Sequence, residues 1–206
     1  MTISFLRSPC SSQNCLKNSI EEDKSYPITD GLSEVSNPVF DKSGRYLYFF
    51  GSTDAGPVKH WFAQSSLDME MNNSIYLAVL GDEDLSPLRR KSDEESGPEK
   101  EDEKDSSVSW DAGDLAEIAN RILDIPVPAG AYFSLAAGKD GELYYLERND
   151  RQQNPFMQSG ALHRFSLNDR KDDLICPNIE EYVISADGAK ILFRSGRSWE
   201  IADTAK

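Results

Sequence analysis

The sequence predicts an all-β fold built from repeated antiparallel hairpins. Three segments share one pattern: a short apolar run, a polar turn containing glycine, and a second run rich in aliphatic and aromatic residues. They are residues 38–50, 134–146 and 182–193. Glycine adopts positive φ at little cost, and an aspartate side chain can hydrogen-bond the backbone of its own turn. Such a turn between two β-prone runs predicts a hairpin in each segment.

Each hairpin is followed by further strand candidates. A third strand is predicted at residues 74–80, 161–167 and 198–202, and the first two of these alternate as a half-buried strand does. A fourth strand fits residues 119–127 and 173–176. Gly188 lies 47 positions after Gly141 (188 − 141), a spacing typical of one four-stranded propeller blade.

These observations predict a partial β-propeller of about three antiparallel four-stranded blades, within a domain that spans residues 23–206. The blades are expected at about 24–127, 128–176 and 177–206, and residues 1–22 are left unassigned.

The first blade is long because it contains an acidic insertion and an excursion at residues 54–73 between two strands. A β-sandwich and an irregular α/β domain are the alternatives, since residues 61–71 and 111–120 could form short helices.

The charge of the chain excludes several classes of partner. There are 22 Lys and Arg against 36 Asp and Glu, which gives a formal net charge of −14. A chain this acidic repels phosphate backbones and anionic membranes, so we expect neither nucleic acid nor membrane as a partner. There is no apolar run of the ~18 residues that a spanning helix needs. No secretory leader is visible, which predicts a cytoplasmic location.

Much of this acidity is concentrated in one segment. Residues 93–105 read DEESGPEKEDEKD, without an apolar side chain to bury. Because such a composition cannot offset the entropy of ordering, residues 92–107 are predicted to be a disordered insertion.

Three blades cannot close a propeller, which needs four to eight. Uncovered blade faces and unpaired strand edges are liabilities that natural proteins cover. We therefore expect the remaining blades to come from a homo-oligomer, from another chain or from a longer polypeptide. The abrupt start and end of the strand pattern favour a fragment of a longer polypeptide.

Several strings in the sequence resemble the N-terminal propeller region of tricorn-type serine proteases. They are residues 26–31 (YPITDG), 37–50 (NPVFDKSGRYLYFF), 52–57 (STDAGP), 61–66, 74–80, 86–88, 121–130 (RILDIPVPAG) and 141–147 (GELYYLE). The resemblance covers about residues 24–202 and is most specific in STDAGP and PVPAG. It implies a non-catalytic propeller that filters peptides on their way to a separate serine-peptidase domain with an adjoining PDZ domain.

The sequence stops before either of those domains would begin, so the resemblance assigns no catalytic residue. The predicted function is thus a scaffold and peptide-access filter in proteolysis, with peptides and the remaining blades as partners. The alternative is a stand-alone propeller-type module that binds a protein partner through its acidic insertion and blade rims.

The residues themselves also favour a chain without catalytic, cofactor or metal sites. His60 and His163 are the two imidazoles, and although Ser65 and Ser66 follow His60, a catalytic triad is recognised by geometry rather than by proximity in sequence. His163 falls in a predicted strand, where a packed or half-exposed side chain is expected rather than a base.

Metal and nucleotide motifs are absent from the sequence as well. Zinc would need clustered Cys and His, but Cys10 and Cys15 have no partner pair and Cys176 stands apart, so all three are expected to be free thiols. The acidic clusters at 82–84 and 93–95 lack the spacing of a calcium loop. Neither a phosphate-binding loop nor a dinucleotide fingerprint occurs.

Aromatic residues in the predicted strands, such as Tyr46, Tyr48, Phe50, Tyr144 and Tyr145, could stack on a ligand. We expect them to fill the space between neighbouring blades instead.

Overall fold

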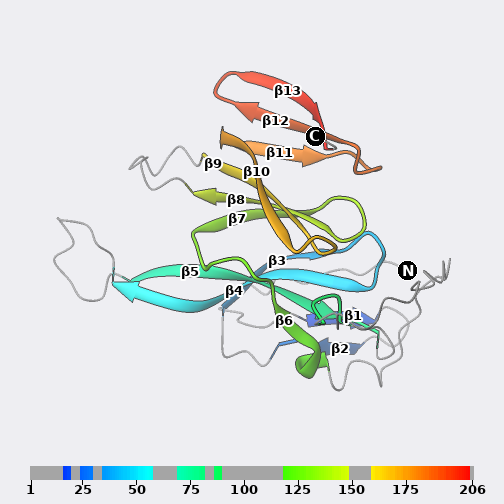
Figure 1. Cartoon of the computed structure of the whole chain (residues 1–206). Coiled ribbons are helices and arrows are strands. Elements are labelled where there is room, and N and C mark those ends of the chain that lie inside the picture. Colours follow the sequence, from blue (N-terminus) through cyan, green and yellow to red (C-terminus); the bar gives the residue numbers. More distant parts are fainter. Residues whose placement is uncertain are drawn as a thin grey trace, which may run out of the picture.

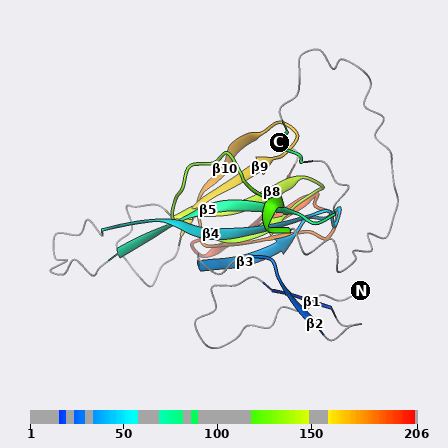
Figure 2. The ribbon, with the colours of Figure 1, turned by 90° about the horizontal axis from the view of Figure 1, so that it is seen from below.

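The computed structural model describes residues 16–19, 24–29, 34–57, 69–81, 86–89, 118–148 and 159–204. Their strands form three antiparallel sheets, each ordered as the strands follow in the chain, and one separate hairpin. We number the three sheets 1 to 3 in chain order. Figure 1 shows them stacked face to face, from sheet 1 at the bottom to sheet 3 at the top. Seen along the stack, the hairpin projects to one side of it (Figure 2).

Each sheet is continuous in sequence. Sheet 1 contains β3 (Glu34–Phe40), β4 (Tyr46–Pro57), β5 (Met69–Val79) and β6 (Ile122–Asp124), the last of which follows a 3₁₀ turn, η1 (Ile118–Arg121). Sheet 2 contains β7 (Tyr132–Ala137), β8 (Glu142–Arg148), β9 (Gly160–Ser166) and β10 (Lys171–Ile179). Sheet 3 contains β11 (Glu181–Ile184), β12 (Lys190–Ser195) and β13 (Ser198–Asp203). The separate hairpin pairs β1 (Leu16–Ser19) with β2 (Lys24–Pro27).

The prediction of an all-β fold with propeller-like sheets is confirmed, with differences in detail. Sheet 3 has three strands in the described part of the chain, where four were predicted. Strand β1 lies within the segment that was left unassigned. Strands β4 and β5 extend into residues 54–57 and 69–73, so the predicted excursion between them is shorter than expected.

Other predictions fall on residues that are not described. The acidic insertion at 92–107 lies outside the described residues, as do positions 61–68 and 111–117 of the two possible helices. The division into blades within a 23–206 domain stays a prediction.

The three predicted hairpin turns are present, and a glycine with positive φ closes each one. Gly44 and Gly141 have a φ of 74° and Gly188 a φ of 68°. In the first and third turns the glycine N–H donates to a carbonyl three residues earlier, that of Asp41 or Ser185. Such φ values favour glycine because a Cβ would meet the following carbonyl oxygen.

The second turn is one residue shorter than the other two. In the first turn, the Asp41 N–H donates to the carbonyl of Tyr46, five residues later. In the second turn, the Gly138 N–H donates to the carbonyl of Glu142, four residues later. Aligning the three glycines therefore misplaces the following strand by one position. Equivalence by strand pairing makes Tyr48 of sheet 1 correspond to Tyr144, and not to Tyr145, in sheet 2.

With this alignment, the same positions of every sheet face the same way along the stack. Tyr48 and Phe50 of β4 pack against sheet 2, and the corresponding Tyr144 and Leu146 of β8 pack against sheet 3. The intervening residues face the other way: Leu143 and Tyr145 pack toward sheet 1, and Ile191 and Phe193 of β12 pack toward sheet 2. Sheet 2 is thus buried on both faces. The aromatic residues fill the space between sheets, as predicted.

The face of sheet 1 that points away from sheet 2 is also covered. Leu47 and Phe49 pack there with Ile28, which follows β2, and with Ile118 of η1. All four side chains are buried.

Side chains and backbone of the hairpin turns connect the sheets along one side of the stack. The carboxylate of Asp41, 3% exposed, accepts hydrogen bonds from Ser43 N–H at 2.9 Å and Tyr48 Oη at 3.1 Å within sheet 1. It also accepts one from Gly141 N–H of the second turn at 3.0 Å. One buried carboxylate therefore holds the first two turns together.

The third turn packs directly on the second. A Cβ on Gly188 would lie 2.9 Å from Lys139 Cγ and 3.0 Å from Lys139 N. The Lys42 ammonium of the first turn donates a hydrogen bond to the Ala186 carbonyl of the third. The three turns are therefore grouped together.

We predict that Gly188→Ala destabilises the protein more than Gly44→Ala. Both positions carry the cost of positive φ, about 1–2 kcal/mol for alanine. A Cβ at Gly44 meets no atom within 4 Å, whereas one at Gly188 meets the backbone of the second turn. The difference should be about 1–3 kcal/mol in the free energy of unfolding from urea denaturation. An equal loss of unfolding free energy in the two variants would show that the second and third turns do not constrain each other.

We also predict that Asp41→Ala costs about 2–4 kcal/mol, because it leaves the Tyr48 hydroxyl and the Gly141 N–H without their acceptor. Asp187→Ala is the matched control, since the hydrogen bonds that its carboxylate makes to described residues stay within its own exposed turn, to Ser185 and Ala189. It should cost less than about 1 kcal/mol. Similar values for the two variants in urea denaturation would contradict the role of Asp41.

Candidate functional site

The outer face of sheet 3, which points away from sheet 2, is the most exposed apolar surface in the described part of the chain. Val183, Leu192 and Ile201 are direct cross-strand neighbours, so they form one row across β11, β12 and β13. Their exposed fractions are 56%, 37% and 69%, and the adjacent Trp199 is 53% exposed. We call these four residues the open face.

The open face corresponds to faces that are packed in the other two sheets. By strand pairing, the row Val183, Leu192 and Ile201 matches Val39, Tyr48 and Leu77 in sheet 1. That row packs against sheet 2. Because side chains on a strand alternate between two faces, one position in two along sheet 3 points out to the open face. The repeat therefore indicates that the open face is a packing surface.

Charged pairs border the apolar row on both sides. On one side Lys190 Nζ lies 3.4 Å from Asp203 Oδ1. On the other, Arg194 Nη2 lies 2.9 Å from Glu180 Oε2, and the guanidinium carbon is 5.9 Å from the Trp199 ring centre. Glu181 Oε2 also lies 4.0 Å from Arg194 Nε, so the surface has an apolar centre and a rim of ion pairs. This arrangement is typical of protein–protein interfaces.

A second candidate site is a hydrogen-bonded cluster around His163 on β9. His163 Nδ1 lies 2.8 Å from Asp172 Oδ2, and Nε2 lies 3.4 Å from Glu147 Oε2. The Tyr145 hydroxyl donates to the other oxygen of Asp172 at 2.7 Å, and its ring stacks on the imidazole with centres 5.2 Å apart. The hydrogen bond with Asp172 raises the pKa of His163 above its usual value.

This cluster joins three strands of sheet 2 through the side chains of Tyr145, His163 and Asp172. Both imidazole nitrogens of His163 have carboxylate neighbours, and the side chain is 15% exposed. Burial, the hydrogen bond and the charge of Asp172 raise the pKa of Tyr145, so its hydroxyl stays protonated. The structure thus places His163 within β9, with its side chain largely buried.

The remaining candidates from the sequence are placed as follows. Cys176 is a half-buried free thiol on β10, and burial raises its pKa, which makes it a poor nucleophile. Cys10, Cys15, His60, Ser65 and Ser66 lie outside the described residues. Within the described ranges, no group of three or more His, Cys, Asp or Glu residues could hold a metal ion. The described segments also contain no helix long and apolar enough to cross a membrane.

Sequence reasoning missed two features of the sheets. The first strands of sheets 1 and 2 carry equivalent β-bulges, at Asn37 and Ser134, both with positive φ near 52° and 53°. The proline that follows Asn37 is a sequence signal for a bulge at that position. The sequence around Ser134 contains no such signal. The open face was also not identified, although Trp199 and Ile201 were within a predicted strand.

Comparisons with known proteins agree with this architecture. No family model matches the chain. The Tricorn protease homolog of Saccharolobus solfataricus is 26% identical over 168 residues, which are 80% of this chain and 14% of that protein. A protein of Sulfurisphaera tokodaii named as a Tricorn-like protease C-terminal subunit is 23% identical over 168 residues, or 80% of this chain and 18% of its own length. The crystal structure of the tricorn protease matches with a TM-score of 0.63 at 14% identity, covering 93% of this chain and 20% of that one.

The repeated sheets and the structural match define the chain as part of a β-propeller. The sequence similarity over most of the chain shows that it is homologous to the tricorn proteases, and that it spans less than a fifth of the length of the curated relatives. It is therefore a β-propeller part related to peptidases.

We predict that the His163 cluster makes stability depend on pH. Because the folded pKa of His163 is raised, its contribution is fully present below the unfolded value of about 6.5 and is lost as pH rises through the raised folded pKa. Urea denaturation of the wild type and of His163→Gln, between pH 5.5 and 9, measures this contribution. The stability difference between the two proteins should fall as pH increases. A difference that is constant with pH would contradict the prediction.

Proposed function

We propose that the chain is a non-catalytic β-propeller segment of a tricorn-like serine peptidase, in which it acts as a scaffold and as a filter for peptide access. Homology to the tricorn proteases over 80% of the chain supports the connection to proteolysis. The observation that carries the scaffold role is the open face of sheet 3. Its equivalents in sheets 1 and 2 each pack against a following sheet.

The partners in this proposal are peptides and the remaining propeller blades, and the location is the cytoplasm. A further sheet would cover Val183, Leu192, Trp199 and Ile201 on the open face, as sheet 2 covers the matching row of sheet 1. Catalysis would reside elsewhere, because His163 and Cys176 are held in structural environments.

A second function is favoured by the rim of the open face. Its ion pairs, Lys190 with Asp203 and Arg194 with Glu180, form a polar rim around an apolar centre, which is typical of a surface that binds a separate protein. The chain would then be a stand-alone propeller-type interaction module without a link to a peptidase.

We predict that the purified chain hydrolyses no peptide above background and co-elutes with the peptidase-bearing polypeptide of the same organism. Leu192→Glu should weaken this association at least about a hundredfold, because it would bury an unpaired charge. Arg197→Glu is the matched control, since it introduces the same side chain at an exposed turn position outside the open face. It should change the affinity less than about threefold.

Peptide hydrolysis should be assayed with short and long peptides, with and without the chain. A filter lowers the cleavage of long peptides more than that of short ones. Hydrolysis by the chain alone, or unchanged association of Leu192→Glu, would contradict the proposal. A chain that binds another protein but not the peptidase would instead support the interaction module.

A further inference from the structure

Two of the hairpin turns contain the dipeptide Asp-Gly, at Asp140 and Gly141 in the second turn and at Asp187 and Gly188 in the third. In this dipeptide the glycine nitrogen can attack the side-chain carboxyl carbon of the aspartate, because no Cβ hinders the approach. A five-membered imide forms, and its hydrolysis yields isoaspartate as well as aspartate. The two turns hold the reacting groups differently. The Asp-Gly at positions 30–31 lies outside the described residues.

The carboxylate of the third turn is held by hydrogen bonds. Asp187 Oδ1 accepts from the Ser185 hydroxyl at 2.5 Å and from the Ala189 N–H at 3.0 Å. The bond from Ser185, then the bond from Ala189 and the charge of Lys42 lower the pKa of Asp187. Because an ionised carboxylate fixed by two donors is a poor electrophile, these contacts protect Asp187 from attack.

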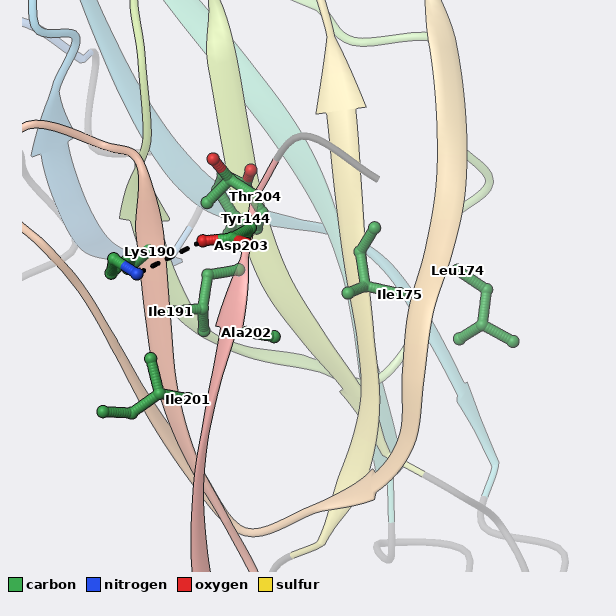
Figure 3. Close-up of a pocket in the computed structure, with 9 residues that line it drawn as sticks. All are labelled: Tyr144, Leu174, Ile175, Lys190, Ile191, Ile201, Ala202, Asp203 and Thr204. Atoms are coloured by element: carbon green, nitrogen blue, oxygen red, sulfur yellow. Dashed lines mark hydrogen bonds and ion pairs between the residues drawn. The ribbon is translucent and has the colours of Figure 1, made fainter.

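The backbone of the third turn is confined as well. The Gly188 N–H donates to the Ser185 carbonyl at 2.8 Å, and the Gly188 carbonyl accepts from the Thr204 hydroxyl at 2.8 Å. Figure 3 shows Thr204 and Asp203 at the end of β13, where Asp203 pairs with Lys190 at 3.4 Å. A Cβ on Gly188 would also meet the backbone of the second turn at 3.0 Å. The Gly188 nitrogen therefore has little room to move toward Asp187.

The second turn restrains its aspartate less. Asp140 is exposed, and its carboxylate makes no hydrogen bond to the part of the chain that the structure describes. The Gly141 N–H donates at 3.0 Å to Asp41 Oδ1 of the first turn. A Cβ on Gly141 would lie 3.6 Å from Leu167 Cβ, an ordinary contact, so this glycine is packed less closely than Gly188.

The kind of hydrogen-bond acceptor matters because the attacking nitrogen must lose its proton. The Gly141 N–H is bonded to a carboxylate, whereas the Gly188 N–H is bonded to a backbone carbonyl. A carboxylate is a much stronger base than an amide carbonyl, and 3.0 Å is within the reach of a general base. The second turn thus combines an unrestrained carboxyl group with a nucleophile that has a base beside it.

We propose that Asp140 is a site of isoaspartate formation, at which Asp41 acts as the base for the Gly141 nitrogen. The nitrogen attacks Cγ of Asp140 in its carboxylic acid form, so a C–N bond forms and a C–OH bond breaks. The amide proton passes to the Asp41 carboxylate and then to the departing hydroxyl, which leaves as water. A second water molecule opens the imide, and opening at its α-carbonyl leaves isoaspartate. No reactant other than water is needed.

This modification acts on the contact between sheets 1 and 2. In isoaspartate the main chain passes through Cβ, so the second turn, the shortest of the three, becomes one atom longer. The Gly141 N–H is then displaced from Asp41, and the hydrogen bond that joins the first two turns is lost. The inference does not depend on the proposed function.

The test incubates the full 206-residue chain at mildly acidic pH and locates isoaspartate by peptide mass spectrometry. We expect at least about fivefold more isoaspartate at position 140 than at position 187, since one hydrogen bond of ordinary strength corresponds to about that factor in rate. The chain unfolded in urea is the control. There the two sites should react at similar rates, because neither carboxylate is held.

Two variants separate the parts of the argument. Asp140→Glu keeps the charge but cannot form the five-membered imide, so no isoaspartate should appear in the second turn. The urea midpoint of the wild type should fall during incubation, and that of Asp140→Glu should stay constant. Ser185→Ala removes one hydrogen bond from Asp187, so it should raise isoaspartate at position 187 about fivefold.

Three results would overturn the inference. The first is an equal amount of isoaspartate at the two positions in the folded chain. The second is a ratio between the positions that is the same in the folded and the urea-unfolded chain, which would show that the sequence alone sets it. The third is an equal fall of the urea midpoint in the wild type and Asp140→Glu, which would show that the modification leaves the contact between sheets 1 and 2 intact.

Discussion

The packing of each sheet on both of its faces is the constraint on which this structure depends. Tyr48 and Phe49 are adjacent on β4, and Tyr144 and Tyr145 are adjacent on β8, yet all four are buried. Because neighbouring side chains on a strand point to opposite faces, such a run is buried only when another layer lies on each side. Sheet 2 lies between sheets 1 and 3, and sheet 1 lies between sheet 2 and the segment that carries Ile28.

Sheet 3 departs from this rule, and the surfaces with functional potential follow from that departure. Ile191 and Phe193 are buried against sheet 2, whereas Leu192 between them is exposed. The open face belongs to this sheet. The polar clusters have a different role: Asp41 and His163 connect turns and strands, and their hydrogen-bonding capacity is used within the protein. The apolar open face, rather than a reactive side chain, is therefore the feature available for recognition.

Much of the architecture could be predicted from the sequence because its signals are local. The glycines at 44, 141 and 188 favour turns because glycine adopts positive φ at little cost, and the aromatic runs after them favour strands. The order of strands within a sheet followed from the same pattern. The bulge at Ser134 and the strand at residues 16–19 could not be predicted, because neither composition nor alternation distinguishes them from their neighbours.

The sequence by itself determined the all-β class, the three hairpins, the acidic character and the resemblance that the comparisons support. The tertiary structure decided the register between repeats, since a turn shortened by one residue moves Tyr144 to the place of Tyr48. It also decided which surfaces are free. Val183, Leu192 and Ile201 are apolar strand residues like those of the core, and only the arrangement of the layers exposes them. Burial is a property of neighbouring layers that a strand's own residues do not encode.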